Sequence, residues 1–156
     1  MTTVADYTDR IIDLSMFNNV QEDGESLLVQ EVAGKDNFGS ICTGVQKVAQ
    51  RVVLRLFTIT GSLKYKPNEG CNFMLHMISG RFRSTVDVFA AFAEAKTSIM
   101  EQFDAEIQDD DPDEERLEEL VLAQVVLAPD FLGLRVRVVT LAGTSRSVII
   151  PIPVIV

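Results

Sequence analysis

The C-terminal part of the chain alternates apolar and polar residues with a period of two, the spacing of a strand with one buried face. The apolar positions are Leu132, Leu134, Val136 and Val138. Arg135 and Arg137 fall on the opposite face, and residues 142–144 (Ala-Gly-Thr) form a turn before residues 145–154 return. The pattern predicts a β-hairpin, or the end of a three-stranded meander, and therefore a sheet at this end of the chain.

Two prolines restrict where the returning strand can lie. Because Pro151 and Pro153 are two residues apart, their missing N–H groups fall on the same edge, and a central strand would lose two ladder hydrogen bonds. We therefore predict a strand at the sheet edge, or one whose outer edge pairs only partly. Two interpretations stay open. The prolines protect the edge against aggregation, or they precede an apolar tail that pairs with a partner strand, namely Val154, Ile155 and Val156.

Size and composition fit one globular domain. A chain of 156 residues, of which 47% are apolar and 24% charged, buries roughly 70% of its unfolded surface on folding. We interpret residues 1–156 as a single α+β domain, in which residues 1–26 can form an extended N-terminal arm. No apolar run approaches the roughly 20 residues of a membrane span, so we expect no membrane contact.

A first helix is predicted over residues 40–58. Its apolar stripe recurs at helical spacing and consists of Val45, Val48, Ala49, Val52 and Leu56. On another face Lys47, Arg51 and Arg55 repeat every four residues. The simple interpretation is a solvated polar face. The functional alternative is a basic ridge that docks on an acidic partner or on the acidic segment of the chain itself.

A second helix is predicted over residues 84–107, with Ser84 and Asp87 as a capping box. We expect its core-facing side to be formed by Val86, Phe89, Ala90, Ala93, Met100, Phe103 and Ile107, widened by Phe92 and Ile99. The predicted fold is α+β, with two main helices packed on a small, mostly antiparallel sheet that ends in a C-terminal β-hairpin.

The segment between the helices, residues 58–71, reads Thr-x-x-Gly-Ser-Leu and then Tyr-x-Pro-x-x-Gly-Cys. Gly61 and Gly70 suit positions with positive φ, and Pro67 fixes a turn or extended geometry. Together with the preceding helix, this segment resembles the baseplate wedge and sheath-initiator family of contractile phage tails, which has a counterpart in type VI secretion baseplates. The loop residues that carry the resemblance are Gly61, Leu63, Tyr65, Pro67 and Gly70, and the helix residues are Gln50, Arg55, Leu56 and Thr58.

The resemblance implies a structural virion protein of the tail baseplate, made in the host cytoplasm. Such a subunit is part of the wedge around the tail tube, and its sheet edge is a platform for the first sheath ring through strand pairing. The implied partners are other wedge proteins, the sheath and the tube, with several copies in a ring. The family often carries an acid-Pro-Arg motif where wedge subunits meet. Here Asp111 and Pro112 match it, Asp113 replaces the Arg, and Arg116 is the nearest base.

No motif for an enzyme, a cofactor or a metal competes with this interpretation. His76 is the single histidine and lies in an apolar run, so we expect it to be structural. The acidic spacing at residues 109–113 fails as a calcium loop, because Glu114 replaces the required Gly and Leu120 the bidentate Glu. Residues 101–119 contain eleven acidic residues and one arginine. This excess of negative charge disfavours nucleic acid as a partner.

Three other functions remain as alternatives. One is a tail-completion or connector protein of the same particle, and another is an acidic adaptor domain with no tail connection. The third is a small hydrolase that acts through His76.

Overall fold

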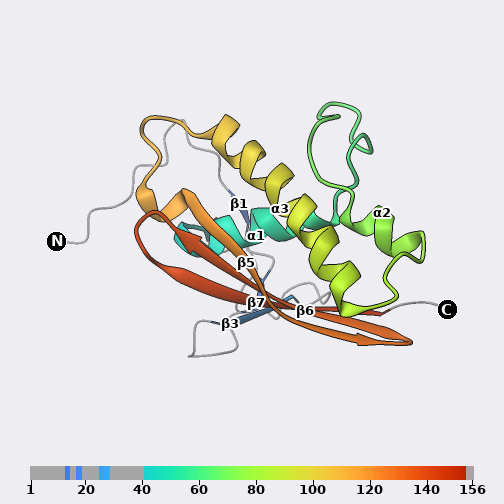
Figure 1. Cartoon of the computed structure of the whole chain (residues 1–156). Helices are drawn as coiled ribbons and strands as arrows, with labels where there is room; N and C mark the ends of the chain where they lie inside the picture. The colour runs from blue at the N-terminus through green and yellow to red at the C-terminus, as the bar shows by residue number, and fades with distance from the viewer. Residues whose placement is uncertain (1–12, 15–16, 19–24, 29–40, 154–156) are drawn as a thin grey trace.

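The computed structural model describes residues 13–14, 17–18, 25–28 and 41–153 (Figure 1). The helices are α1 (Gly44–Phe57), α2 (Phe73–Ile78) and α3 (Thr85–Glu106), with a short 3-10 helix η1 (Asp113–Glu115). The long strands are β5 (Leu117–Ala128), β6 (Phe131–Thr140) and β7 (Ser145–Pro153). The short ones are β1 (Asp13–Leu14), β2 (Phe17–Asn18), β3 (Glu25–Leu28) and β4 (Ile41–Cys42).

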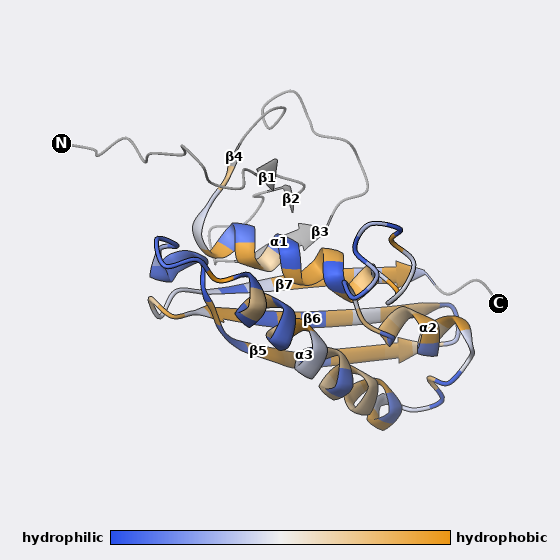
Figure 2. Cartoon of the chain, turned by 90° about the horizontal axis from the view of Figure 1, so that it is seen from above, coloured by the Kyte–Doolittle hydropathy of each residue, from blue (hydrophilic) through white to orange (hydrophobic). Residues whose placement is uncertain are grey.

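The helices and the sheet form two layers (Figure 1 and Figure 2). In the described part of the chain α1 packs on β6 and β7, and α3 packs on β5. The sheet order is β2-β3-β7-β6-β5, in which β6 pairs antiparallel with both β5 and β7. The predicted fold class is thus confirmed: helices pack on an antiparallel three-stranded sheet at the C-terminal end.

Two of the N-terminal strands extend this sheet: β3 pairs in parallel with β7 through Ser147–Ile149, and β2 pairs antiparallel with β3. β1 and β4 form a separate two-stranded sheet. Most of the predicted arm, residues 1–26, lies outside the described residues, so its extended form stays a prediction. The predicted helix over 40–58 begins only at Gly44, because Ile41 and Cys42 pair as β4.

The core lies between the two layers and is built from alternate strand positions. On β6 and β7 the buried side chains are Leu132, Leu134, Val136, Val138, Val148, Ile150 and Ile152. From the helices they meet Val48, Val52, Leu56, Val88, Phe92 and Ile99. Each such aliphatic or aromatic side chain contributes about 1.5–3 kcal/mol by leaving water, which makes this interface the main stabilising feature of the fold.

The face that α3 turns to the core differs from the prediction. Its buried residues are Val88, Ala91, Phe92, Ala95, Ile99 and Phe103. Val86 is 72% exposed and Phe89 44% exposed, and Ala90 and Ala93 are also exposed. The helix has apolar residues on two sides, so periodicity alone could not choose between them. The contact with β5 selects the stripe that begins at Val88.

Two further elements lie on either side of α3. The short helix α2 follows the loop that ends at Cys71. Strand β5 begins at Leu117, inside the acidic segment of residues 101–119, and Leu117 pairs with Thr140 on β6. None of the described helices is long and apolar enough to cross a membrane.

Candidate interaction surfaces

The loop from Thr58 to Cys71 stands out from the body of the molecule between α1 and α2 (Figure 1). Its ends are held together, because the Cys71 N–H donates to the Thr58 carbonyl at 2.9 Å and Ile59 forms a parallel bridge with Cys71. Within the loop the Gly61 N–H donates to the Pro67 carbonyl at 2.9 Å. A surface loop with closed ends is an Ω-loop, a class that often carries function.

Gly70 attaches this loop to α3. Its N–H donates to Gln102 Oε1 at 2.9 Å, and its carbonyl accepts from Gln102 Nε2 at 2.7 Å and from Ser98 Oγ at 3.2 Å. Its φ is +98°, and a Cβ there would lie 2.2 Å from the Thr58 carbonyl oxygen. The predicted positive φ is confirmed for Gly70 and for Gly61. Sequence reasoning missed Ser98 and Gln102, whose spacing of four on α3 is their one local signal.

The tip of the loop presents apolar and basic side chains to solvent. Tyr65 is 87% exposed and Leu63 41% exposed. Lys64 Nζ lies 5.3 Å from the centre of the Tyr65 ring, and Lys66 Nζ lies 3.2 Å from Glu69 Oε2. A tyrosine side chain offers a large contact area and has only two torsions to fix on binding, so this tip is suited to contact a partner.

Arg55 joins the loop, α1 and the end of α3. It is 4% exposed, its Nε lies 3.7 Å from Glu69 Oε1, and its Nη2 pairs with Glu106. The guanidinium carbon lies 4.5 Å from the centre of the Phe103 ring. Since Glu69 belongs to the loop and Glu106 ends α3, this buried arginine fixes the base of the loop against both helices.

The other basic residues of α1 also face the chain's own acids. Lys47 is 8% exposed and its Nζ lies 2.8 Å from Glu115 Oε2. Arg51 Nη1 lies 3.9 Å from Glu106 Oε2. A solvated polar face is therefore the wrong interpretation for Lys47 and Arg55, because long-range pairing buries both. The ridge docks on the acidic residues of the chain itself, and a further contact of its residues with a partner stays a prediction.

Pro112 and Arg116 lie in the connection from α3 to β5. Pro112 is half-buried and precedes η1. Arg116 Nη2 donates to the carbonyls of Gln108 at 3.2 Å and Asp109 at 3.3 Å. In the described chain these contacts fold the acidic segment onto itself, and the predicted contact of Pro112 and Arg116 with a neighbouring subunit stays a prediction.

The two prolines of β7 lie in the half of that strand beyond its pairing with β3. Pro151 is opposite Gly133 and Pro153 is opposite Phe131 on β6, whereas the described pairing with β3 ends at Ile149. The pairing with β6 includes both prolines and ends at Pro153, so their nitrogens face the other edge. Within the described residues the outer edge of β7 pairs over Ser147–Ile149 alone, which agrees with partial pairing, one of the two predicted arrangements. Residues 154–156 lie outside the described residues, and their role stays a prediction.

The side chains with catalytic potential have structural partners. His76 Nδ1 lies 3.1 Å from Arg81 Nη1, and its Nε2 lies 3.4 Å from Glu94 Oε2. Burial raises the pKa of the Cys71 thiol, which opposes the formation of a reactive thiolate. The described part of the chain contains no group of three or more residues suited to hold a metal ion.

No protein-family model, curated protein or solved structure matches this chain.

Proposed function

We propose that the chain is a structural subunit that joins neighbouring proteins in the baseplate of a contractile tail, with the loop from Thr58 to Cys71 as its principal contact. The family resemblance of the sequence lies in this segment. The same segment has an exposed tip, and hydrogen bonds and ion pairs hold its base to α1 and α3. The proposal is therefore one of protein–protein contact.

The observation that carries the proposal is the combination of a clamped base and an exposed tip. Gln102 and Ser98 bond to Gly70, and Arg55 pairs with Glu69, while Tyr65 remains 87% exposed. Ordering a loop costs about 1–2 kcal/mol per residue, so contacts that already order the base reduce the ordering that a partner has to impose. A tyrosine presented in this way provides a large contact area with few rotatable bonds.

The remaining proposals follow from this role. The neighbours are other wedge proteins, the sheath and the tail tube, and several copies form a ring in the virion. We propose that residues 154–156 continue β7 as a strand for the first sheath ring, which the partly paired outer edge of β7 supports. Backbone pairing would supply affinity there, and alternate side chains would set the register. Neither a membrane nor nucleic acid is a partner on this proposal.

Co-expression with the products of the neighbouring open reading frames, followed by native mass spectrometry, tests the proposal. We expect a complex of fixed stoichiometry with a larger wedge protein or with sheath. Tyr65→Ala should lose this complex, and Leu141→Ala, which changes another exposed apolar residue on a turn, should keep it. If the wild-type chain forms no complex although all the co-expressed products are soluble, the baseplate role is contradicted. If Tyr65→Ala forms the complex in the same yield as the wild type, the loop is not the contact.

A further inference from the structure

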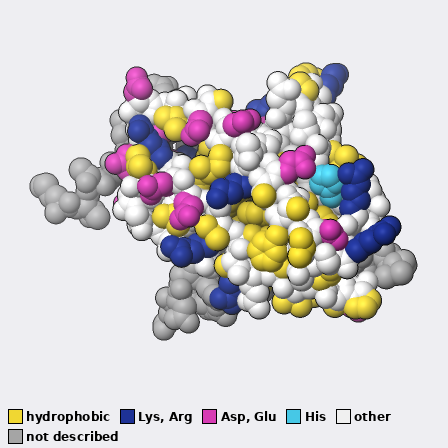
Figure 3. All heavy atoms as spheres, in the orientation of Figure 1, with side chains coloured by type: hydrophobic (Ala, Val, Ile, Leu, Met, Phe, Trp, Pro, Cys, Tyr) yellow, Lys and Arg dark blue, Asp and Glu magenta, His cyan; other side chains and the backbone are white. Residues whose placement is uncertain are grey.

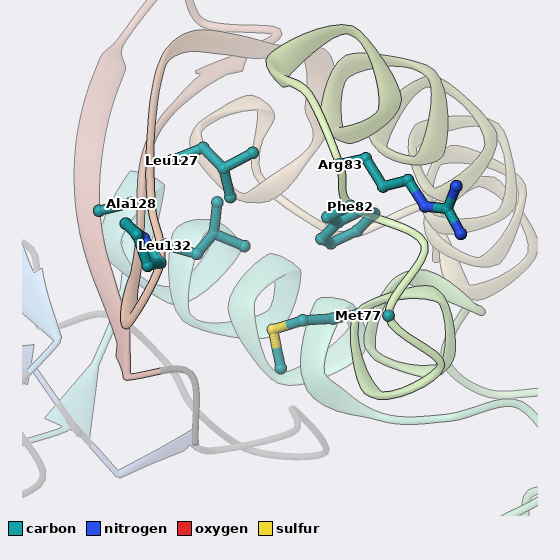
Figure 4. A pocket seen from close by; sticks show the side chains of 8 residues that line it. Met77, Phe82, Arg83, Leu127, Ala128 and Leu132 are labelled. Carbon is teal, nitrogen blue, oxygen red and sulfur yellow. The ribbon is translucent and has the colours of Figure 1, made fainter. Parts of the chain in front are cut away.

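A cavity of about 380 Å³ opens where the connection from α2 to α3 meets the turn between β5 and β6 (Figure 4). It is lined by Met77, Gly80, Phe82, Arg83, Leu127, Ala128, Pro129 and Leu132. In the close-up the side chains of Met77, Phe82 and Leu132 face the open space, and the Arg83 guanidinium points away from it. The cavity is therefore apolar inside and has a cationic group on its outer wall.

An exposed apolar residue lies at the other end of α3. Ile107 is the C-cap of the helix and is 45% exposed. The neighbouring acidic residues Asp104, Asp109 and Asp110 are exposed as well. A branched aliphatic side chain left in water among carboxylates gains most by entering an apolar site that has cations beside it.

The two ends of α3 differ in charge. Residues 101–119 contain eleven acidic residues and one arginine, whereas the segments around the cavity, residues 77–87 and 127–132, contain two arginines and two aspartates, Arg81, Arg83, Asp87 and Asp130. Acidic side chains gather at the end where α3 meets β5, and basic side chains with His76 gather at the opposite end (Figure 3). Arg81 and Arg83, beside the cavity, are both exposed. The acidic end that carries Ile107 is thus complementary to the two exposed arginines beside the cavity.

The contact between these two ends has to be made by different molecules. Helix α3 has 22 residues, which corresponds to about 33 Å at 1.5 Å per residue, and it separates Ile107 from the cavity of its own chain. We propose that Ile107 of one copy inserts into the cavity of a second copy, with its flanking carboxylates facing Arg81 and Arg83. The interface uses two different surfaces, so it repeats head to tail and is not closed by a two-fold axis.

Sedimentation of the purified chain alone tests this inference independently of the loop and of any wedge protein. At about 0.05 M salt the average mass should rise with concentration beyond that of a dimer, and at about 0.5 M salt it should fall, because screening weakens the charge contacts. Ile107→Asp should lower the association constant by about tenfold or more. Leu127→Phe, which enlarges a side chain that projects into the open space (Figure 4), should have the same effect. Leu141→Asp is the matched control and should associate like the wild type.

A mixture of the two variants separates head-to-tail contact from other modes. Ile107→Asp keeps an intact cavity and Leu127→Phe keeps an intact Ile107, so the mixture should form dimers and no larger species. Circular dichroism checks that each variant is folded. If Leu127→Phe does not fold, the comparison of Ile107→Asp with Leu141→Asp still tests the inference, because both wild-type side chains are about half exposed. A wild type that is monomeric at every concentration in low salt, or an Ile107→Asp variant that associates like the wild type, would overturn the inference.

Discussion

At the scale of single residues, buried charges connect segments that are far apart in the chain. Lys47 on α1 and Glu115 in η1 are separated by 68 positions, and their side chains are 10% and 7% exposed. Such a pair loses much of its hydration on folding, so each charge depends on the other. Removing one of the two charged side chains should therefore lower the free energy of unfolding far more than removing both.

Lys47→Met should lower the free energy of unfolding by about 3–5 kcal/mol, because Glu115 keeps a buried charge without its partner. Lys47→Met combined with Glu115→Leu should recover most of this loss. Urea denaturation of both variants measures the difference, and Lys64→Met, at the exposed loop tip, is the control with little expected change. Equal destabilisation by the single and the double change would contradict the dependence of the two charges on each other.

Gly70→Ala should destabilise the loop more than Gly61→Ala. Both positions have positive φ, which costs about 1–2 kcal/mol for a residue with a side chain. Only at Gly70 would the added Cβ also meet backbone, whereas nothing lies within 4 Å at Gly61. Thermal unfolding of the two variants provides the test. A similar loss of stability in both would show that the close approach of Thr58 relaxes at no cost.

At the scale of elements, α3 begins with a capping box, which the sequence predicts. Ser84 Oγ accepts from the Asp87 N–H at 3.4 Å, and Asp87 Oδ2 accepts from the Ser84 N–H at 2.9 Å. The predicted capping box is confirmed. Hydrogen bonds from the Ser84 hydroxyl and from the N–H groups of Arg83 and Ser84 lower the pKa of Asp87.

Ser84→Ala should lower the free energy of unfolding by about 1 kcal/mol, through the loss of the cap. It should also bring the pKa of Asp87 back toward its ordinary value of 3.8, which NMR titration of the carboxyl carbon measures. Since the folded pKa is the lower one, the capping bonds of Asp87 stabilise the fold fully above pH 3.8 and lose their effect as the pH falls through the folded pKa. An unchanged Asp87 titration in Ser84→Ala would show that the hydroxyl has no part in the shift.

At the scale of the whole molecule, one apolar layer joins the sheet to both long helices. Leu134 lies on β6, in the middle of the three long strands, and is 1% exposed. Val126 lies on β5, outside this layer, and is 47% exposed. The same type of truncation should therefore have very different effects at these two positions.

Leu134→Ala should lower the free energy of unfolding by about 2–5 kcal/mol, because it removes buried methyl groups and leaves a cavity. Val126→Ala should change it by no more than about 0.5 kcal/mol. Chemical denaturation followed by circular dichroism compares the two variants. Comparable losses at both positions would mean that the sheet face beneath α1 is not the principal core.

The sequence by itself predicted the local features of this fold. The hairpin of β6 and β7 follows from alternation, α1 and α3 from their apolar spacing, and the cap of α3 from Ser84 and Asp87. The partly paired edge of β7 follows from Pro151 and Pro153. Each of these depends on residues within one or two turns or strands, where spacing and backbone chemistry specify the structure directly.

Only the tertiary structure decided which surfaces are buried and which are available. α3 is apolar on two sides, and its contact with β5 leaves Val86 and Phe89 in solvent. The charges of Lys47 and Arg55 are buried because acids from distant segments meet them. The cavity forms between residues 77–83 and 127–132. These features arise from long-range packing, in which free energy depends on what each side chain meets and not on its spacing along the chain.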